Sequence, residues 1–176
     1  LTLTDNNGCL YYDSFYIDEP TEMASTILST SNYNGYDISC FNFNDGSLDI
    51  IVSGSVPPYS YNWSNGGNQA TLDSLFFGFH SVEVIDANGC THQDTIVLSQ
   101  PDSIASSIVS VNDFNGYDIS CNDFNDGAID VTISGGVGPY IYSWNNGAGV
   151  EDIDNLTAGN YSINILDQNI LKYLPC

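Results

Sequence analysis

The chain has 176 residues, of which 42% are hydrophobic, so it can bury real cores and does not have the composition of a disordered segment. With 22 acidic residues against a single basic one, its formal net charge is −21 at pH 7. Such a surface repels nucleic-acid phosphates and anionic lipids and attracts hard cations such as Ca²⁺, which argues against nucleic acid or a membrane as partners. No apolar run reaches the roughly 20 residues of a transmembrane helix, and the first residues lack the basic start of a signal peptide.

The sequence repeats itself at an offset of 81 residues. Residues 53–66 return as residues 134–147, each copy carrying a Gly/Pro turn, an alternating Tyr-x-Tyr-x-Trp strand and an Asn-Gly turn. The period predicts small units of about 80 residues. We expect residues 1–19 to be the closing strands of a preceding repeat, residues 20–100 a complete repeat, and residues 101–176 a second repeat that lacks its last strand.

Short strands separated by turn residues follow in chain order. A closing strand is expected at residues 10–17, and the complete unit then gives strands at 24–31, 47–52, 59–63, 81–85 and 94–98, with a crossing segment at 70–75 and a corner at Gly78. Seven or so strands without a helical stretch predict an antiparallel β-sandwich of immunoglobulin-like type.

The second unit follows the same pattern as far as Asp167. Its residues 156–161 have the form of a tyrosine corner around Tyr161, a position that His80 occupies in the first unit. Residues 169–176 depart from the repeat, and Leu171 stands where the first unit has Cys90.

The motif set resembles a known repeat family. It comprises Cys40 followed by Asn-Asp-Gly, the Ser-Gly-x-Val-x-Pro-Tyr-x-Tyr-x-Trp strand, a Leu-x-x-x-Gly corner, Val-x-Val-x-Asp-Ala-Asn-Gly-Cys-Thr and a closing Ser-Gln-Pro. Together these resemble the SprB-type repeats of very large adhesins of gliding Bacteroidota, over all but the last ten residues. The resemblance implies export by type IX secretion and a surface module used in adhesion, gliding motility or filament building.

A catalytic role has little support, and we expect no enzyme. The two histidines, His80 and His92, do not recur at the repeat offset, and a catalytic acid or nucleophile paired with a base would have to arise in one repeat only. Trp63 and Trp144 are expected in the sandwich cores, with sugar stacking as the alternative. That alternative corresponds to a carbohydrate-binding module of a secreted enzyme.

Recurring carboxylates and amides make calcium the candidate cofactor. Oxygen ligands from several loops at one end of a sandwich can hold Ca²⁺ between tandem modules, although Asn-Asp-Gly is also simply a good turn. The candidate ligands are Asp37, Asn44, Asp45, Asp86, Asp118, Asn125, Asp126 and Asp167.

The cysteines follow the repeat and indicate an oxidising, extracellular compartment. We predict a disulfide between Cys40 and Cys90 within one repeat. A sandwich that places the two at opposite ends would instead favour a bond across a domain junction, and Cys9 and Cys121 are candidates for bonds between repeats or subunits.

Several short patterns are candidate glycosylation sites. Asn155 and Asn160 fit the Asn-x-Ser/Thr pattern. The resemblance implies O-glycosylation at Asp-Ser/Thr-aliphatic sequences, whose acceptors here are Ser74, Thr95 and Ser103.

Two interpretations of residues 1–19 stay open. In the first, neighbouring repeats of a longer array supply both ends of the chain. In the second, the amino-terminal strand of one subunit completes the open sandwich of the next, giving a head-to-tail filament. In either case we predict a non-catalytic structural or adhesive module at the bacterial cell surface, with sister subunits, neighbouring repeats or surface glycans as partners.

Overall fold

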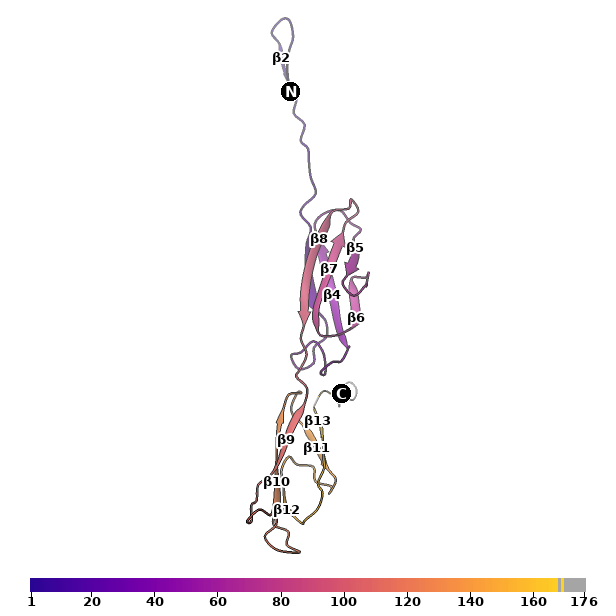
Figure 1. Cartoon of the computed structure of the whole chain (residues 1–176). Coiled ribbons are helices and arrows are strands. Elements are labelled where there is room, and N and C mark those ends of the chain that lie inside the picture. Colours follow the sequence, from indigo (N-terminus) through magenta and orange to yellow (C-terminus); the bar gives the residue numbers. More distant parts are fainter. Residues whose placement is uncertain (168, 170–176) are drawn as a thin grey trace.

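The computed structural model describes residues 1–167 and 169 of the chain (Figure 1). Within this part every regular element is a β-strand, and all strand pairs are antiparallel. The predicted all-β fold is therefore confirmed. No helix in the described part is long and apolar enough to cross a membrane.

The first unit consists of two three-stranded sheets packed face to face. One sheet has the order β3 (Ala24–Ser29), β4 (Gly46–Ser53), β6 (Thr71–Leu75), and the other β5 (Ser60–Trp63), β7 (Gly78–Ile85), β8 (Thr91–Leu98). Their inward side chains form one core that includes Leu48, Trp63 and Val84. Alternation along β7, where Val82 and Val84 are buried and Ser81 is exposed, orients this sheet toward the core.

The second unit repeats this arrangement 81 residues later. Its sheets are β9 (Ala105–Ser110), β10 (Gly127–Ser134), β12 (Ile153–Leu156) and β11 (Ile141–Trp144), β13 (Ile163–Leu166). Its core gathers around Val131, Trp144 and Leu156. The counterpart of β8 would begin at residue 172, so the predicted lack of a last strand lies outside the described residues.

The first nineteen residues stand apart from both sandwiches (Figure 1). They form a hairpin of β1 (Thr2–Thr4) and β2 (Leu10–Tyr12), with Leu3 opposite Tyr11. This is the register of β7 with β8, in which Val84 lies opposite His92. The hairpin is therefore the tip of a repeat's second sheet, without an opposing sheet to cover it.

One glycine in each unit allows the linker that enters the unit to pack closely against the turn after the second strand. Gly54 follows β4 with φ of +77°, and a Cβ there would lie 2.0 Å from the carbonyl oxygen of Glu22. Gly135 has the same relation to Ser103. A side chain would displace the incoming linker, so the Ser-Gly turn of the repeat motif fixes how each unit begins.

The predicted strands agree with the structure in position but not in every boundary. The complete unit has six strands: the expected crossing segment forms β6, and Gly78 begins β7 instead of forming a corner before it. The closing strand expected at residues 10–17 is paired only over Leu10–Tyr12. The immunoglobulin-like subtype and the boundaries at residues 19 and 100 stay predictions.

Candidate functional site

The two sandwiches lie end to end, and the joint between them is built from polar contacts among the described residues (Figure 1). The linker after β8 is held by the loop between β3 and β4. The Ser99 carbonyl oxygen accepts hydrogen bonds from the amides of Asp37 and Ile38 at 3.2 and 3.0 Å. The Asp37 carboxylate in return accepts the Ser99 amide at 2.8 Å and its hydroxyl at 2.7 Å.

These bonds tune the Asp37 carboxyl. Partial burial raises its pKa, but hydrogen bonds donated by Ser29 and Ser99 outweigh that effect and place the pKa below its usual range. The linker is therefore anchored by an ionised side chain at neutral pH. Pro101 follows, fully buried between the units.

Asn169 of the second unit docks directly on the first unit. Its side-chain amide donates to the Ser39 carbonyl oxygen at 2.7 Å, and its Oδ1 accepts from Asn34 Nδ2 at 2.7 Å. Asp167 accepts the Asn169 backbone amide at 3.0 Å and so shapes the turn that presents it. Asn169 is 1% exposed and Ser39 2%, so both ends of the contact are removed from water.

The same positions are uncovered where no repeat is seated on them. We call residues 34–40 and 115–121 the socket loops, which are identical in sequence, and the turns containing Asn88 and Asn169 the asparagine turns. In the first socket loop Ser39 is buried, whereas Ser120 of the second is exposed. Asn169 is buried, whereas Asn88 is exposed. The chain therefore presents an unused asparagine turn at one end and an unused socket loop at the other.

A cleft borders the joint. Cys40 and Phe41 line one side, and the other side is formed by residues of the second unit that include Ile104, Gly136 and Asp167. The two sandwiches thus meet through the socket contact and leave a gap beside it.

The eight candidate calcium ligands do not come together. Where the structure gives them partners, they accept hydrogen bonds from other loop residues: Asp45 from the Ser39 amide at 3.0 Å, and Asp167 from the Val137 amide at 3.1 Å. Asn44, Asp118 and Asn125 are exposed. Among the described residues no three His, Cys, Asp or Glu side chains are grouped as a metal site.

Calcium binding therefore stays a prediction, which a melting curve tests. If calcium is a structural ligand, EDTA lowers the unfolding temperature by several degrees, because binding to the native state alone stabilises it. An unchanged curve contradicts calcium as a structural ligand.

Asp86 is the most heavily used of these carboxylates. It accepts the Ser55 hydroxyl at 2.5 Å and the amides of Asn88 and Cys90 at 2.9 and 2.7 Å. The bond from Ser55, supported by the backbone amides, lowers the pKa of its carboxyl. Asp126 is similar: the bonds from the Ser120 hydroxyl and amide lower its pKa and shape the second socket loop. Two of the predicted metal ligands thus shape an asparagine turn and a socket loop.

The predicted Cys40–Cys90 disulfide is absent. Cys90 is an exposed free thiol, whereas Cys40 is 3% exposed and is not a free thiol. Eight residue pairs of β7 and β8 separate the socket loop, beside Ser99, from Cys90, just before Thr91. At about 3.3 Å per residue this is roughly 23 Å, against about 4.4–6.8 Å between the Cα atoms of a disulfide. Cys9 and Cys121 are also exposed free thiols, so their predicted bonds to other repeats stay predictions.

The aromatic strand serves the core. Trp63 and Trp144 are 3% and 4% exposed, and each indole donates to a backbone carbonyl, of Gln69 and Val150, at 2.9 Å. They are core residues as predicted, so neither offers a face for sugar stacking. His80 is 9% exposed, with Nε2 at 2.9 Å from the Phe76 carbonyl oxygen, while Tyr161 donates to Thr157 O at 2.9 Å. His80 thus fills a structural position.

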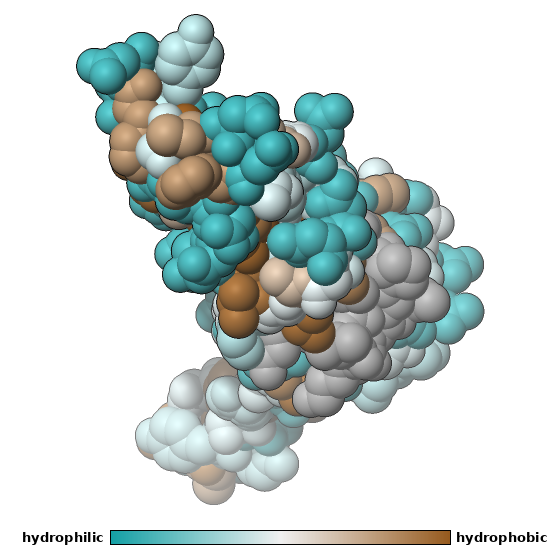
Figure 2. Space-filling view, turned by 90° about the horizontal axis from the view of Figure 1, so that it is seen from below, coloured by the Kyte–Doolittle hydropathy of each residue, from teal (hydrophilic) through white to brown (hydrophobic). Residues whose placement is uncertain are grey.

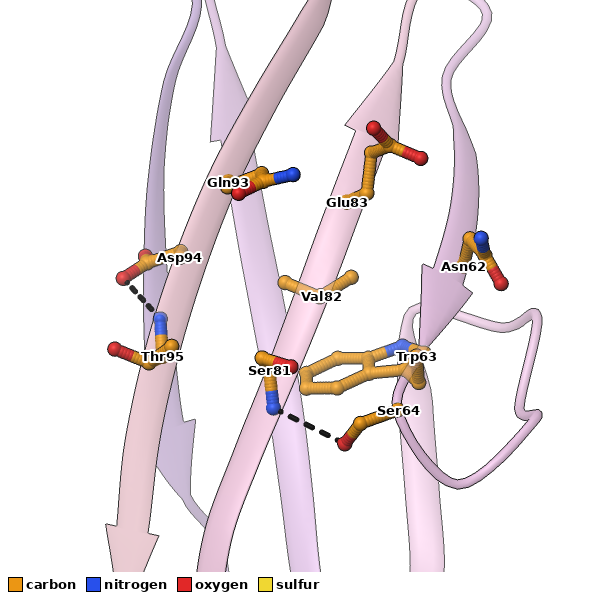
Figure 3. A pocket seen from close by; sticks show the side chains of 9 residues that line it. All are labelled: Asn62, Trp63, Ser64, Ser81, Val82, Glu83, Gln93, Asp94 and Thr95. Atoms are coloured by element: carbon orange, nitrogen blue, oxygen red, sulfur yellow. Dashed lines mark hydrogen bonds between the residues drawn. The ribbon is translucent and has the colours of Figure 1, made fainter.

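A shallow depression over β5, β7 and β8 is lined mainly by polar side chains (Figure 3). Glu83 and Gln93 lie over neighbouring strands there, and the drawn hydrogen bonds join Ser81 to Ser64 and Thr95 to Asp94. We find no nucleophile paired with a base in this depression. The five candidate glycosylation acceptors, Ser74, Thr95, Ser103, Asn155 and Asn160, are all exposed, and their modification stays a prediction.

The second unit carries an apolar groove at its free end. It is lined by residues that include Ile108, Ile119, Gly127 and Leu156. In the first unit the corresponding place is filled by Leu98, whose Cδ1 lies 3.0 Å from where a Gly46 Cβ would be. Figure 2 views the molecule from below and shows hydrophobic atoms exposed among hydrophilic ones on this face.

The repeat, the all-β sandwiches and their end-to-end joint define a tandem-repeat protein of β-sandwiches. Residues 33–68 and 117–149 each match the family model of the SprB repeat, so the chain carries two SprB-type repeats. SprB repeats are structural repeat modules of cell-surface proteins. No curated protein matches the chain.

Sequence reasoning missed the socket contact. The signal was present, because residues 34–40 return without a change as residues 115–121. We interpreted these loops as calcium ligands, and an 81-residue period alone does not say which parts of neighbouring repeats touch.

Proposed function

We propose that the chain is a spacer segment of an extracellular adhesin or filament, in which similar sandwiches joined end to end carry an adhesive part away from the cell. The observation that carries this proposal is the joint. Two pairs of polar contacts hold one repeat on the next: Asn169 with Ser39, and Asp37 with Ser99. Short, doubly anchored linkers favour a stiff array over a flexible string of domains.

Surface charge supports the same function. A net charge of −21 keeps neighbouring rods apart and discourages lateral association. The exposed thiols of Cys9, Cys90 and Cys121 are available for disulfides to other copies in an oxidising environment outside the cell. Surface glycans and sister subunits are the partners that we propose.

Small-angle X-ray scattering of the chain tests the spacer role. A compact globule of this length has a radius of gyration of about 16 Å. End-to-end sandwiches give a clearly larger value and a scattering curve of a rod, and negative-stain images show a constant angle between units. Asn169→Ala is the matched variant, and its angle distribution broadens. A compact particle, or units side by side, contradicts the proposal.

We further propose head-to-tail assembly by strand donation, in which residues 1–19 of one copy complete the second unit of another. Phe15 and Ile17 are 90% and 84% exposed, yet they stand at the repeat positions of Ile96 and Leu98 on the core side of β8. Leu1 and Leu3 correspond in the same way to the buried Val82 and Val84. The segment therefore has the apolar pattern of β8 without a core to cover.

The apolar groove of the second unit is the complementary surface. It lies where Leu98 lies in the first unit, so Ile17 of a second copy would occupy it. A heterologous contact of this kind does not close on itself and generates a fibre.

Deletion of residues 1–19 tests strand donation. We expect the deleted chain to stay monomeric in light scattering while the intact chain forms linear oligomers. The first sandwich, which contains none of these residues, keeps its circular dichroism and melting temperature. Filaments that persist after the deletion rule out strand donation but leave the spacer function in place.

A further inference from the structure

We propose that consecutive repeats are joined by a disulfide across each junction, between the cysteine that ends the socket loop of one repeat and the cysteine that follows the asparagine turn of the next. In this chain Cys121 would pair with Cys90 of the copy or repeat that follows. The inference deepens the proposed spacer function and rests on the joint, not on strand donation.

The first step of the argument is that the joint is reusable. The exposed socket loop at residues 115–121 has the same sequence as the occupied one at residues 34–40. The exposed Asn88 holds the same place in its turn as the docked Asn169, and Asp86 and Asp167 shape the two turns in the same way. A following repeat can therefore seat its Asn88 against Asn115 and Ser120.

The second step is that this seating brings two thiols together. Cys121 follows Ser120 directly, and Cys90 comes two residues after Asn88. In the occupied joint the asparagine nitrogen lies 2.7 Å from the socket carbonyl. Two residues span at most about 7 Å, so both cysteines lie next to the same contact, and a disulfide requires their Cα atoms to come within about 4.4–6.8 Å.

The third step is the state of the cysteines. Cys90 and Cys121 are exposed free thiols at opposite ends of the described repeats, so they cannot pair within one copy. Cys40, at the occupied socket loop, is buried, whereas its twin Cys121 is exposed. At the junction inside this chain, Leu171 stands at the repeat position of Cys90. Cys40 therefore has no cysteine at that position to pair with, and any partner thiol would come from another segment.

The reaction is a thiol–disulfide exchange with a small-molecule disulfide such as oxidised glutathione. Each cysteine loses its proton, a sulfur–sulfur bond forms between them, and the oxidant accepts two electrons and leaves as two thiols. Docking through Asn88 raises the local concentration of the two thiols and makes this pair form before random ones.

An in-phase fusion tests the pairing without relying on self-assembly. Residues 1–167 of one copy are joined directly to residues 6–176 of a second, because Asp167 and Asp5 hold the same repeat position. This places Cys121 of the first copy beside the docked turn of Cys90 in the second. After incubation with oxidised and reduced glutathione, we expect the unreduced peptide map to contain the Cys121–Cys90 cross-link and maleimide labelling of Cys121 to be lost.

Two variants of the fusion are matched to this result. Cys90→Ser in the second copy restores labelling of Cys121, and Asn88→Ala in the second copy slows formation of the bond. Recovery of both thiols, or a bond from Cys121 to Cys9 instead, overturns the proposal. A rod-shaped fusion with both thiols free contradicts the disulfide but is consistent with the spacer function. A bond that forms in the fusion while single chains stay monomeric supports the disulfide and contradicts strand donation.

Discussion

At the scale of single residues, the unit depends on glycines that other residues cannot replace. Gly54→Ala places a methyl group against the Glu22 carbonyl. A Cβ in ideal geometry would lie only 2.0 Å from the carbonyl oxygen, which is a severe overlap. The positive φ alone costs about 1 to 2 kcal/mol, and the overlap adds to it by moving the linker. We expect the melting temperature of the first unit to fall by several degrees or more.

Gly66→Ala is the control for this prediction. Gly66 has φ of +85°, but no atom lies within 4 Å of the place that an added methyl group would take. Gly66→Ala therefore tests the cost of the positive φ alone, without a steric overlap. We expect this variant to melt at a higher temperature than Gly54→Ala. Equal melting temperatures contradict the close approach of Gly54 to the linker.

The stability that Asp86 gives to the asparagine turn depends on pH. The pKa of Asp86 is lowered from 3.8, so folding favours its ionised form. Its stabilisation is present above pH 4 and is lost as the pH falls through the lowered value. We expect Asp86→Asn to lower the melting temperature at pH 7 and to flatten its decrease as the pH falls below about 4. Identical acid limbs for the two proteins contradict this role.

At the scale of elements, the exposed segment after β2 gives a paired test. Ile17 stands at the position of Leu98, which is 1% exposed, whereas Tyr16 stands at that of Val97, which is 53% exposed. If residues 10–17 add to the sandwich of another copy, Ile17→Asp places a charge in the apolar groove and abolishes assembly. Tyr16→Asp places its charge in water and has little effect. Sedimentation velocity distinguishes the two, and equal behaviour contradicts the β8-like orientation.

Much of the architecture could be predicted at this scale. The Tyr-x-Tyr-x-Trp strand and the Asn-Gly turns locate β5 and β11, because alternation and turn chemistry are local properties. The tryptophans could be placed in the core for the same reason. Gly78 was misassigned because a glycine at a strand end and a glycine at a corner look alike in sequence.

The long-range contacts could not be predicted. The pairing of Cys40 was wrong because the repeat period fits a bond within one unit and a bond to the next unit equally well, and only the length of β7 and β8 separates them. The socket contact of Asn169 was missed for the same reason. Carboxylates such as Asp45 and Asp86 looked like ligands because the turns that use them have the residue types of calcium loops.

At the scale of the whole molecule, charge opposes assembly. Two copies that carry −21 each repel one another at the joint, where no basic side chain compensates among the described residues. Screening shortens from about 30 Å at 0.01 M to about 8 Å at 0.15 M salt. We therefore expect linear oligomers to form more readily as NaCl rises over this range, measured by light scattering, and oligomers that dissociate with added salt contradict a joint made of hydrogen bonds and apolar contacts.

The direction in which each sandwich is threaded has a further consequence. The chain enters the first unit at one end through β3 and leaves at the other through β8, two strands that run side by side and are tied by Ser25 and Asp94. Tension between cell and substratum would pull these strands along their length, so the ladders to β4 and β7 resist in shear with all their hydrogen bonds loaded together. If the proposed spacer bears such tension, we expect each repeat to resist until its ladders break together.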